Sequence, residues 1–255
     1  MVVSGAGFQA SAALTIGGVA AGDVVVVDAS TIDGIVPALP PGTLNDIAVT
    51  NPTRAWLVQR IDSVLPRGWL SDFLDVPQAD IFHGDVETIF RAGITAGCGG
   101  GNYCRNAPVT RAQMAVFLLK AEHGSQYVPP ACSGVFGDVA CPSLFADWIE
   151  QLAEEGITGG CGGGDYCPGN AVTRRQMAAL LLKTHLGSTY VPPPATGIFE
   201  DVPLSDPFAP WIEDLYVRQI TGGCQSSPRL YCPSSPNTRG QMAVFLTKTF
   251  GLGSP

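Results

Sequence analysis

GITGGCGGGDYCPGNAVTRRQMAALLLK, residues 156–183, is the stretch that decides the fold, because the chain carries three versions of it. GITAGCGGGNYCRNAPVTRAQMAVFLLK occupies residues 93–120, and a looser version, ITGGCQSSPRLYCPSSPNTRGQMAVFLTK, occupies residues 220–248. Each version joins a cysteine-bracketed loop to a segment with the pattern of a helix. The sequence is therefore that of a repeat protein, in which one supersecondary unit is copied.

The copies keep a constant spacing along the chain. Intervals of 63 residues separate the first loop cysteines, Cys98, Cys161 and Cys224, and also the phenylalanines that open three F-x-D-V motifs, Phe73, Phe136 and Phe199. A fixed period means that each copy leaves an apolar face for its neighbours to cover. We expect one domain over residues 1–66, followed by repeats over residues 67–135, 136–198 and 199–255.

Composition excludes several classes of function. The chain has 255 residues, 45% of them hydrophobic, which is enough for a sizeable core. Its net charge of -8 argues against nucleic-acid and anionic-membrane surfaces, since both reward clustered positive charge. No run approaches the roughly 18 apolar residues of a membrane-spanning helix. The first residues, MVVSGAGFQ, lack the features of a signal peptide, so we expect the export signal to be absent from this chain.

The eight cysteines fall into neighbouring pairs, which indicates local disulfides. The predicted pairs are Cys98–Cys104, Cys132–Cys141, Cys161–Cys167 and Cys224–Cys232, although only proximity selects this connectivity. Disulfides favour an oxidising, extracytoplasmic location. Zinc is the alternative, but a C-x5-C spacing is wider than that of structural zinc sites.

Residues 1–66 have the pattern of short strands. Alternating or β-branched runs at residues 12–16, 24–28, 31–36 and 46–50 are separated by glycine- and proline-containing turns. Strands at this spacing predict a β-sandwich. Residues 56–65 could supply its last strand or form a short helix.

From Phe73 onward the pattern changes to pairs of helices. In the second copy, Gly156 stands where a C-terminal cap ends the first helix. Thr173 and Gln176 predict a capping box at the start of the second helix, and Val172 faces Met177 as a hydrophobic staple. The third copy keeps the capping box but has Asn237 in the staple position.

The first turn of each second helix carries an arginine: Arg111, Arg174 and Arg239. A cation is unfavourable at a helix N-terminus unless an anion lies nearby. One hypothesis is a structural ion pair to an aspartate of the F-x-D-V motifs, Asp75, Asp138 or Asp201. The other is an anion pocket made of the guanidinium and free helix N–H groups. Trp148 and Trp211 are either core anchors or sugar platforms.

The sequence shows no pattern of an active site and implies no cofactor. The three histidines occupy non-equivalent positions, and no nucleophile stands in a supporting motif. We therefore expect a non-enzymatic protein with no metal site. Asp165 and Asn102 could bind calcium, but one such residue per loop is weak support.

F-x-D-V, W-I-x-x-L, G-I-T-G-G, C-P and V-T-R-x-Q-M-A together resemble the S-layer homology (SLH) domain, in three copies over residues 73–255. The resemblance implies an all-α, pseudo-threefold bundle of helix-loop-helix repeats that binds cell-wall glycopolymers in grooves between repeats. The family's binding arginine lies in a T-R-A-E motif, which matches Arg111, Arg174 and Arg239. The tryptophans and the F-x-D-V aspartates would shape the grooves.

Residues 2–52, with SGAGFQ, IGGVAAGDVVVVDASTI and PALPPGTLNDIAVTNP, resemble the IPT/TIG family of immunoglobulin-like domains. That family's first strand is absent here, which predicts an incomplete sandwich with an edge open to self-association. The chain also departs from the SLH pattern: glutamine replaces the glutamate of T-R-A-E, a cysteine-bracketed loop replaces the usual one, and Arg105 replaces the proline seen at Pro168.

These resemblances imply a secreted bacterial protein that attaches non-covalently to a cell-wall polysaccharide or peptidoglycan-linked glycopolymer at the cell surface. The alternative is a structural subunit that assembles into a surface layer or fibre. A third hypothesis is that the repeats are attachment modules of an enzyme whose catalytic domain lies outside this chain.

Overall fold

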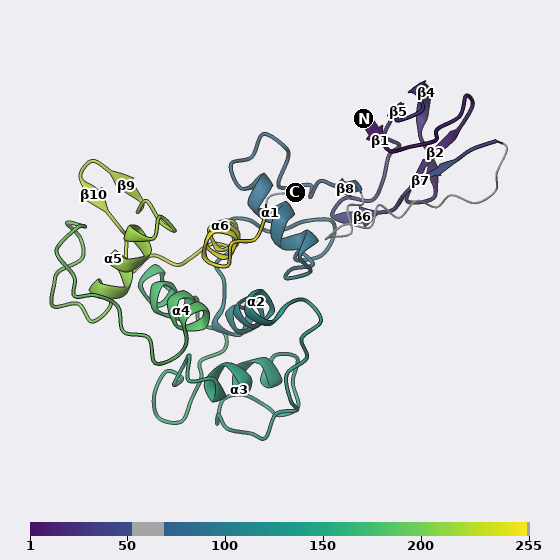
Figure 1. The fold of residues 1–255 in the computed structure, drawn as a ribbon. Helices are drawn as coiled ribbons and strands as arrows, with labels where there is room; N and C mark the ends of the chain where they lie inside the picture. Colours follow the sequence, from purple (N-terminus) through teal and green to yellow (C-terminus); the bar gives the residue numbers. More distant parts are fainter. Residues whose placement is uncertain (53–68, 254–255) are drawn as a thin grey trace. The chain divides into compact units, whose positions relative to one another are not determined.

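The structure, a computed structural model, describes residues 1–52 and 69–253 (Figure 1). The chain divides into two compact units. The first, here called the β unit, comprises Met1–Asp80 and Gly97–Tyr103. The second, the helical unit, comprises Ile81–Ala96 and Cys104–Ser254.

Small antiparallel sheets build the β unit. Two of them have three strands, in the orders β1-β5-β4 and β3-β2-β7, and a third pairs β6 with β8. The strands are β1 (Val2–Ser4), β2 (Ala13–Ile16), β3 (Val19–Ala20), β4 (Gly22–Asp28), β5 (Thr31–Ile35), β6 (Thr43–Asn45), β7 (Ile47–Thr50) and β8 (Trp69–Ser71).

The two three-stranded sheets contribute to one hydrophobic core. Val3 of β1 and Ile32 of β5 lie opposite each other in the register of the first sheet, and Leu14 of β2 joins them in the core. In β5 the buried residues alternate with more exposed ones, as expected for a strand with one covered face. The strands predicted near residues 12–16, 24–28, 31–36 and 46–50 are present. The prediction for residues 56–65 lies outside the described residues.

The described residues of the helical unit form six short helices. They are α1 (His83–Arg91), α2 (Arg111–His123), α3 (Ala146–Glu154), α4 (Arg174–Leu186), α5 (Ala209–Val217) and α6 (Arg239–Thr249). A two-stranded hairpin, β9 (Gln225–Ser226) and β10 (Arg229–Leu230), lies between the last two. In the part of the chain that is described, no helix combines the length and apolar character needed to cross a bilayer.

Capping boxes fix the starts of α2, α4 and α6, as the sequence predicts. In α4 the Thr173 side chain accepts from the Gln176 N–H, and the Gln176 side chain accepts from the Thr173 N–H. The same reciprocal pair is present at Thr110 and at Thr238. After the shorter helix α3, Gly156 takes a positive φ of 73°. This is the left-handed conformation in which glycine commonly ends a helix.

Three backbone hydrogen bonds close a ring among the residues that precede the capping threonines. Val109 N–H donates to Asn237 O at 2.9 Å, Val172 N–H to Val109 O at 2.9 Å, and Asn237 N–H to Val172 O at 2.8 Å. All three residues are completely buried. The ring brings the starts of α2, α4 and α6 together, and these helices contact one another (Figure 1).

Each of these longer helices also packs against a shorter helix of another copy. The contacting pairs are α2 with α3, α4 with α5, and α6 with α1. The last pair is close enough that a β-carbon at Gly240, in the first turn of α6, would lie 2.6 Å from Phe82. Glycine at this position therefore permits the close approach of α6 to the start of α1.

The prediction of an all-α, pseudo-threefold bundle of three SLH helix-loop-helix repeats is wrong. The six described helices are short, small sheets precede them, and the β9–β10 hairpin lies between α5 and α6. The Phe73 motif and the loop Gly97–Tyr103 of the first copy belong to the β unit, whereas the third loop forms the β9–β10 hairpin. The loops have this structure because backbone pairing and polar side chains hold them, not because helices cover them.

Candidate functional site

Arg111 and Arg174, the first residues of α2 and α4, are each held by a tyrosine of the following copy. Nε of Arg111 donates to Tyr166 O at 2.7 Å, and Nε of Arg174 donates to Tyr231 O at 2.8 Å. The tyrosine hydroxyls return the contact by donating to the arginine carbonyl oxygens, both at 2.9 Å. The guanidinium carbons lie 4.6 and 4.7 Å from the tyrosine ring centroids, so each arginine also makes a cation–π contact.

The aspartates of the F-x-D-V motifs bind the other side of the same tyrosines. Asp138 accepts from the N–H groups of Tyr166 and Cys167, both at 2.7 Å. Asp201 accepts in the same way from Tyr231 at 2.8 Å and Cys232 at 2.7 Å. The Tyr166 N–H bond is the main cause that lowers the pKa of Asp138. Each buried tyrosine is thus fixed between an arginine and an aspartate.

No ion pair joins Arg111 to Asp138 or Arg174 to Asp201 within 4.0 Å, and all four residues lie in the described chain. The ion-pair hypothesis is therefore wrong at these two positions. The charges still interact at longer range, since Arg111 is a minor cause of the lowered pKa of Asp138.

The first-turn N–H groups of these helices are also occupied. In α2, Arg111 N–H donates to Asn170 O at 2.8 Å and Ala112 N–H donates to Pro168 O at 3.0 Å, while Thr110 accepts from the next two. The corresponding groups of α4 and α6 are bonded in the same manner. The N–H groups that the anion-pocket hypothesis needs are not free, because the neighbouring loop already supplies their acceptors.

The three arginines differ in what surrounds their guanidinium groups. Arg111 is 8% exposed, and its Nη2 is buried without a hydrogen-bond partner. Burial lowers the pKa of Arg174, which also lies 5.7 Å from the ring of Phe245. Arg239 lies 5.4 Å from the ring of Phe117. Of the three first-turn arginines in the described chain, Arg111 is the one with an orphaned nitrogen.

Trp148 and Trp211 are half-buried and belong to matching surface clusters. In the Trp148 cluster, Lys120 Nζ lies 5.9 Å from the indole and the Tyr127 ring meets it edge-on at 6.2 Å. The Trp211 cluster contains Lys183 and Tyr190 at the same distances, 5.9 and 6.2 Å. Both tryptophans therefore keep part of an aromatic face at the surface.

The two clusters differ at the tyrosine hydroxyl. Tyr190 Oη donates to Asp214 at 2.7 Å and accepts from Arg218 at 3.0 Å. Arg218 also donates to Asp214 at 3.1 Å, so each of the three residues is hydrogen-bonded to the other two. Within the described residues no such partner holds the hydroxyl of Tyr127. Hydrogen bonds to Asp214 and Arg218 therefore fix the tyrosine of the Trp211 cluster, whereas the tyrosine of the Trp148 cluster lacks such bonds among the described residues.

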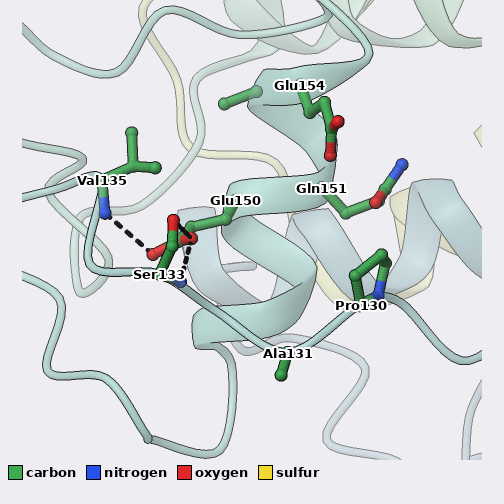
Figure 2. A pocket seen from close by; sticks show the side chains of 8 residues that line it. Pro130, Ala131, Ser133, Val135, Glu150, Gln151 and Glu154 are labelled. Carbon is green, nitrogen blue, oxygen red and sulfur yellow. Dashed lines mark hydrogen bonds between the residues drawn. The ribbon is translucent and has the colours of Figure 1, made fainter.

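Two glutamates that the sequence analysis missed hold the linkers between copies. Glu150 of α3 accepts from the N–H groups of Ser133, Gly134 and Val135 at 2.6–2.9 Å. Figure 2 shows the bonds to Ser133 and Val135. Glu213 of α5 accepts equivalently from three N–H groups of residues 196–198. The pKa of each glutamate is lowered by these backbone bonds, which outweigh the opposing effect of burial. We call each carboxylate with its three N–H groups a linker cradle.

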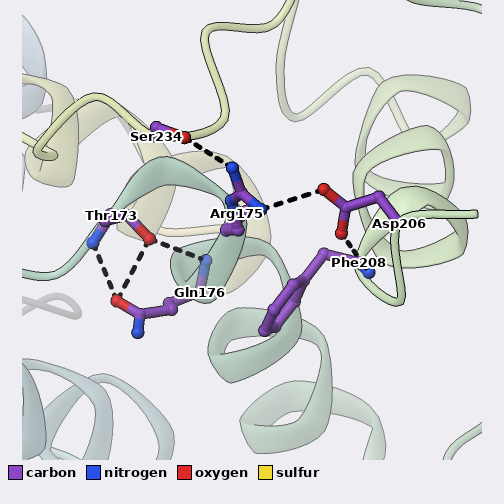
Figure 3. Close-up of polar contacts among 6 residues, drawn as sticks. All are labelled: Thr173, Arg175, Gln176, Asp206, Phe208 and Ser234. Carbon is purple, nitrogen blue, oxygen red and sulfur yellow. Dashed lines mark hydrogen bonds and ion pairs between the residues drawn. The ribbon is translucent and has the colours of Figure 1, made fainter. Parts of the chain in front are cut away.

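An ion pair found only in the second copy links α4 to the start of α5. Arg175, which follows Arg174, pairs with Asp206 at 3.0 Å and donates to Ser234 (Figure 3). Asp206 also accepts from the N–H of Phe208, the N-cap residue of α5. The equivalent positions in the other copies are Ala112 and Gly240, so the charge of Arg175 is a local addition.

None of the eight cysteines, all of which lie in the described part of the chain, is free. The structure forms disulfides between Cys132 and Cys141, Cys161 and Cys167, and Cys224 and Cys232. Cys98 and Cys104 are also disulfide-bonded, and since the other six cysteines are paired among themselves, this agrees with the predicted pairing Cys98–Cys104. Disulfide formation leaves no thiolate for zinc. Two groups of potential metal ligands occur among the described residues, and both depend on disulfide cysteines. Asp165 and Asn102, the calcium candidates, belong to neither group.

Residues 72–115 match the model of the S-layer homology domain. The matched segment begins at the first F-x-D-V motif, contains α1 and the first cysteine loop, and ends in the first turns of α2. SLH domains are in general non-catalytic modules that anchor proteins at the cell surface by binding cell-wall polymers. The match covers one copy, and the second and third copies lie outside it. A search of curated proteins found no match to the chain.

Proposed function

We propose that this chain is a non-enzymatic anchoring module that attaches a secreted bacterial protein to a cell-wall glycopolymer. The observation that carries the proposal is that the matched SLH segment contains the motifs that recur in the two following copies. F-x-D-V and T-R-x-Q-M stand at equivalent positions in all three, and two of the copies build the same arginine–tyrosine–aspartate arrangement. All three copies then contribute to attachment.

The proposed contact surface consists of the two tryptophan clusters and the first-turn arginines. Aromatic faces that are half-exposed beside a lysine suit sugar rings, which have apolar C–H faces and polar edges. The orphaned Nη2 of Arg111 supports a contact with an anionic substituent, because a buried donor without an acceptor costs about 1–3 kcal/mol. Arg174 and Arg239 are its counterparts, and Asp75, Asp138 and Asp201 hold the tyrosine loops in place.

The β unit supports a second candidate function, a subunit that assembles edge to edge. β4 is an end strand of its sheet among the described residues, and its Val25 and Val27 side chains are more than half exposed. An exposed apolar edge strand is a ready template for pairing with another chain. An incomplete IPT/TIG domain would present such an edge.

Co-sedimentation with isolated bacterial cell-wall sacculi tests the anchoring function. The full chain is compared with a Trp148→Ala/Trp211→Ala variant and with Glu200→Gln, an exposed control outside the clusters. We expect the wild type and the control to pellet with sacculi and the double variant to lose most binding, while all three unfold at similar temperatures. An unchanged double variant, or wild-type protein that stays in the supernatant, overturns the proposal. Pelleting without sacculi supports assembly instead.

A further inference from the structure

A hollow against α3 has the size of a ligand subsite. It lies between α3 and the linker residues 130–135, has a volume of about 380 Å³ and is partly open (Figure 2). Ligand pockets occupy roughly 300–1,000 Å³. Gln151, which lines the hollow, lies one helical turn after Trp148, so the two side chains share a face of α3. Trp148 itself is not among the residues that line the hollow.

The backbone N–H groups of residues 132–135, on the linker wall of the hollow, already donate to carboxylates of α3. Cys132 N–H donates to Asp147 at 2.9 Å, and the next three N–H groups donate to Glu150 in the linker cradle. Pro130 has no N–H to offer. On this wall, Ala131 N–H is the backbone donor that makes no hydrogen bond to another described residue.

Acceptors remain. Gln151 donates one amide N–H to Glu155 at 2.9 Å, and its carbonyl oxygen and second N–H make no hydrogen bond to another described residue. Glu154 is exposed, and no hydrogen bond to another described residue holds its carboxylate. The residues lining the hollow include two glutamates and neither lysine nor arginine. The lining therefore suits a ligand with hydroxyl groups, which both donate and accept hydrogen bonds, and its two carboxylates disfavour an anion.

The third copy lacks the two acceptor side chains that Gln151 and Glu154 provide in the second copy. Val217 stands at the position equivalent to Glu154, and Asp214 stands at that of Gln151. The carboxylate of Asp214 is already bonded to Tyr190 and Arg218. The free acceptors are therefore a property of the second copy, not of the repeat.

We propose that the hollow binds one hydroxyl-donating sugar unit without negative charge, neutral or amino, whose hydrogen bonds go to Gln151 and Glu154. The inference rests on the proposed function, because the sugar unit would belong to the wall polymer. The second copy would then select a sugar unit without negative charge, whereas the first-turn arginines favour an anionic one.

Calorimetric titration of the full chain with three defined probes tests this selection. The probes are chitotetraose, which is neutral, its fully deacetylated glucosamine counterpart, which is cationic, and tetragalacturonate, which is anionic. We expect chitotetraose, the glucosamine tetramer or both to bind. The affinity should fall about tenfold in Glu154→Val, which places the valine of the third copy in the hollow. Glu200→Val, with the same change of charge at an exposed site elsewhere, should bind as the wild type does.

Glu154→Gln separates the two favoured ligands. It keeps an acceptor and removes the charge, so chitotetraose binding should persist if the ligand is neutral, and glucosamine binding should weaken if it is an amino sugar. Preferential binding of tetragalacturonate, an unchanged Glu154→Val variant, or binding of tetralysine but of no sugar overturns the inference. If wild-type protein pellets with sacculi yet binds no tetramer, the inference fails and the anchoring function stands. If it does not pellet, the anchoring function fails.

Discussion

The linkers into the second and third copies are held by the same cradle, but only one of them is also cross-linked. Glu150 and Glu213 each accept three successive backbone N–H groups. The Cys132–Cys141 disulfide spans the first of these linkers, whereas the third copy has Ala195 and Leu204 at the equivalent positions. The carboxylate is therefore the common means of fixing the linker, and the disulfide is an addition to it.

Removal of Glu213 should have the largest effect, because nothing covalent holds its linker. Glu213 is 6% exposed, and Glu213→Ala orphans three N–H groups, so we expect a loss of about 3 kcal/mol in the free energy of unfolding. Glu150→Ala should cost about half as much, since the disulfide retains its linker. Urea unfolding of both variants measures the difference. Equal losses would show that the disulfide does not substitute for the cradle.

The disulfide itself should contribute less than the Glu213 cradle. Cys132→Ala/Cys141→Ala opens a short loop, for which the loss of chain restriction predicts about 2 kcal/mol in the free energy of unfolding. When the pair is removed together with Glu150, the loss should exceed the sum of the separate losses. The double-mutant cycle in urea measures this coupling, and a simple sum would mean that cradle and disulfide act independently.

A smaller effect, of opposite sign, is expected where the third copy departs from the others. Asn237 replaces the valine found at Val109 and Val172, and its buried Oδ1 has no hydrogen-bond partner. Asn237→Val removes the orphaned oxygen and restores the staple residue, so we expect a gain of about 1 kcal/mol in stability. Val172→Asn is the reverse control and should destabilise. A loss in Asn237→Val would indicate that the amide is satisfied in the folded protein.

The smallest expected effect is a dependence of stability on pH. The folded-state pKa of Glu213 lies below the ordinary value of 4.5, because its backbone bonds favour the carboxylate. Its stabilisation is therefore complete above about pH 4.5 and is lost as the pH falls through the lowered value. Urea midpoints measured from pH 6 to pH 3 should fall less steeply in Glu213→Gln than in the wild type. Parallel curves would contradict the lowered pKa.

Local signals in the sequence predicted local structure well. The capping boxes at Thr110, Thr173 and Thr238 are present because each depends on residues three positions apart. Four strands of the β unit also follow from turn signals and alternation. The strands β6 and β8 do not, since their pairing joins segments distant in sequence.

The partners of the arginines could not be predicted from one copy. Arg111 reaches Tyr166 of the next copy, 55 residues away. A signal existed, because a tyrosine precedes the second cysteine of every loop, at Tyr103, Tyr166 and Tyr231. Burial raises the pKa of Tyr166 to about 12, so its hydroxyl stays protonated and can donate to Arg111. The repeat pattern shows that the tyrosine recurs, but it does not show which copy supplies the arginine that contacts each tyrosine.

The ring of backbone bonds among Val109, Val172 and Asn237 limits how many copies such a chain can hold. In an open stack of repeats, each added unit extends the array and leaves a fresh end. Here Asn237 donates its N–H to Val172 and accepts at its carbonyl oxygen from Val109. The first and last copies of the series are therefore already joined. A fourth copy would have to break this circuit before it could enter, and loss of the third would leave the first without a closing partner.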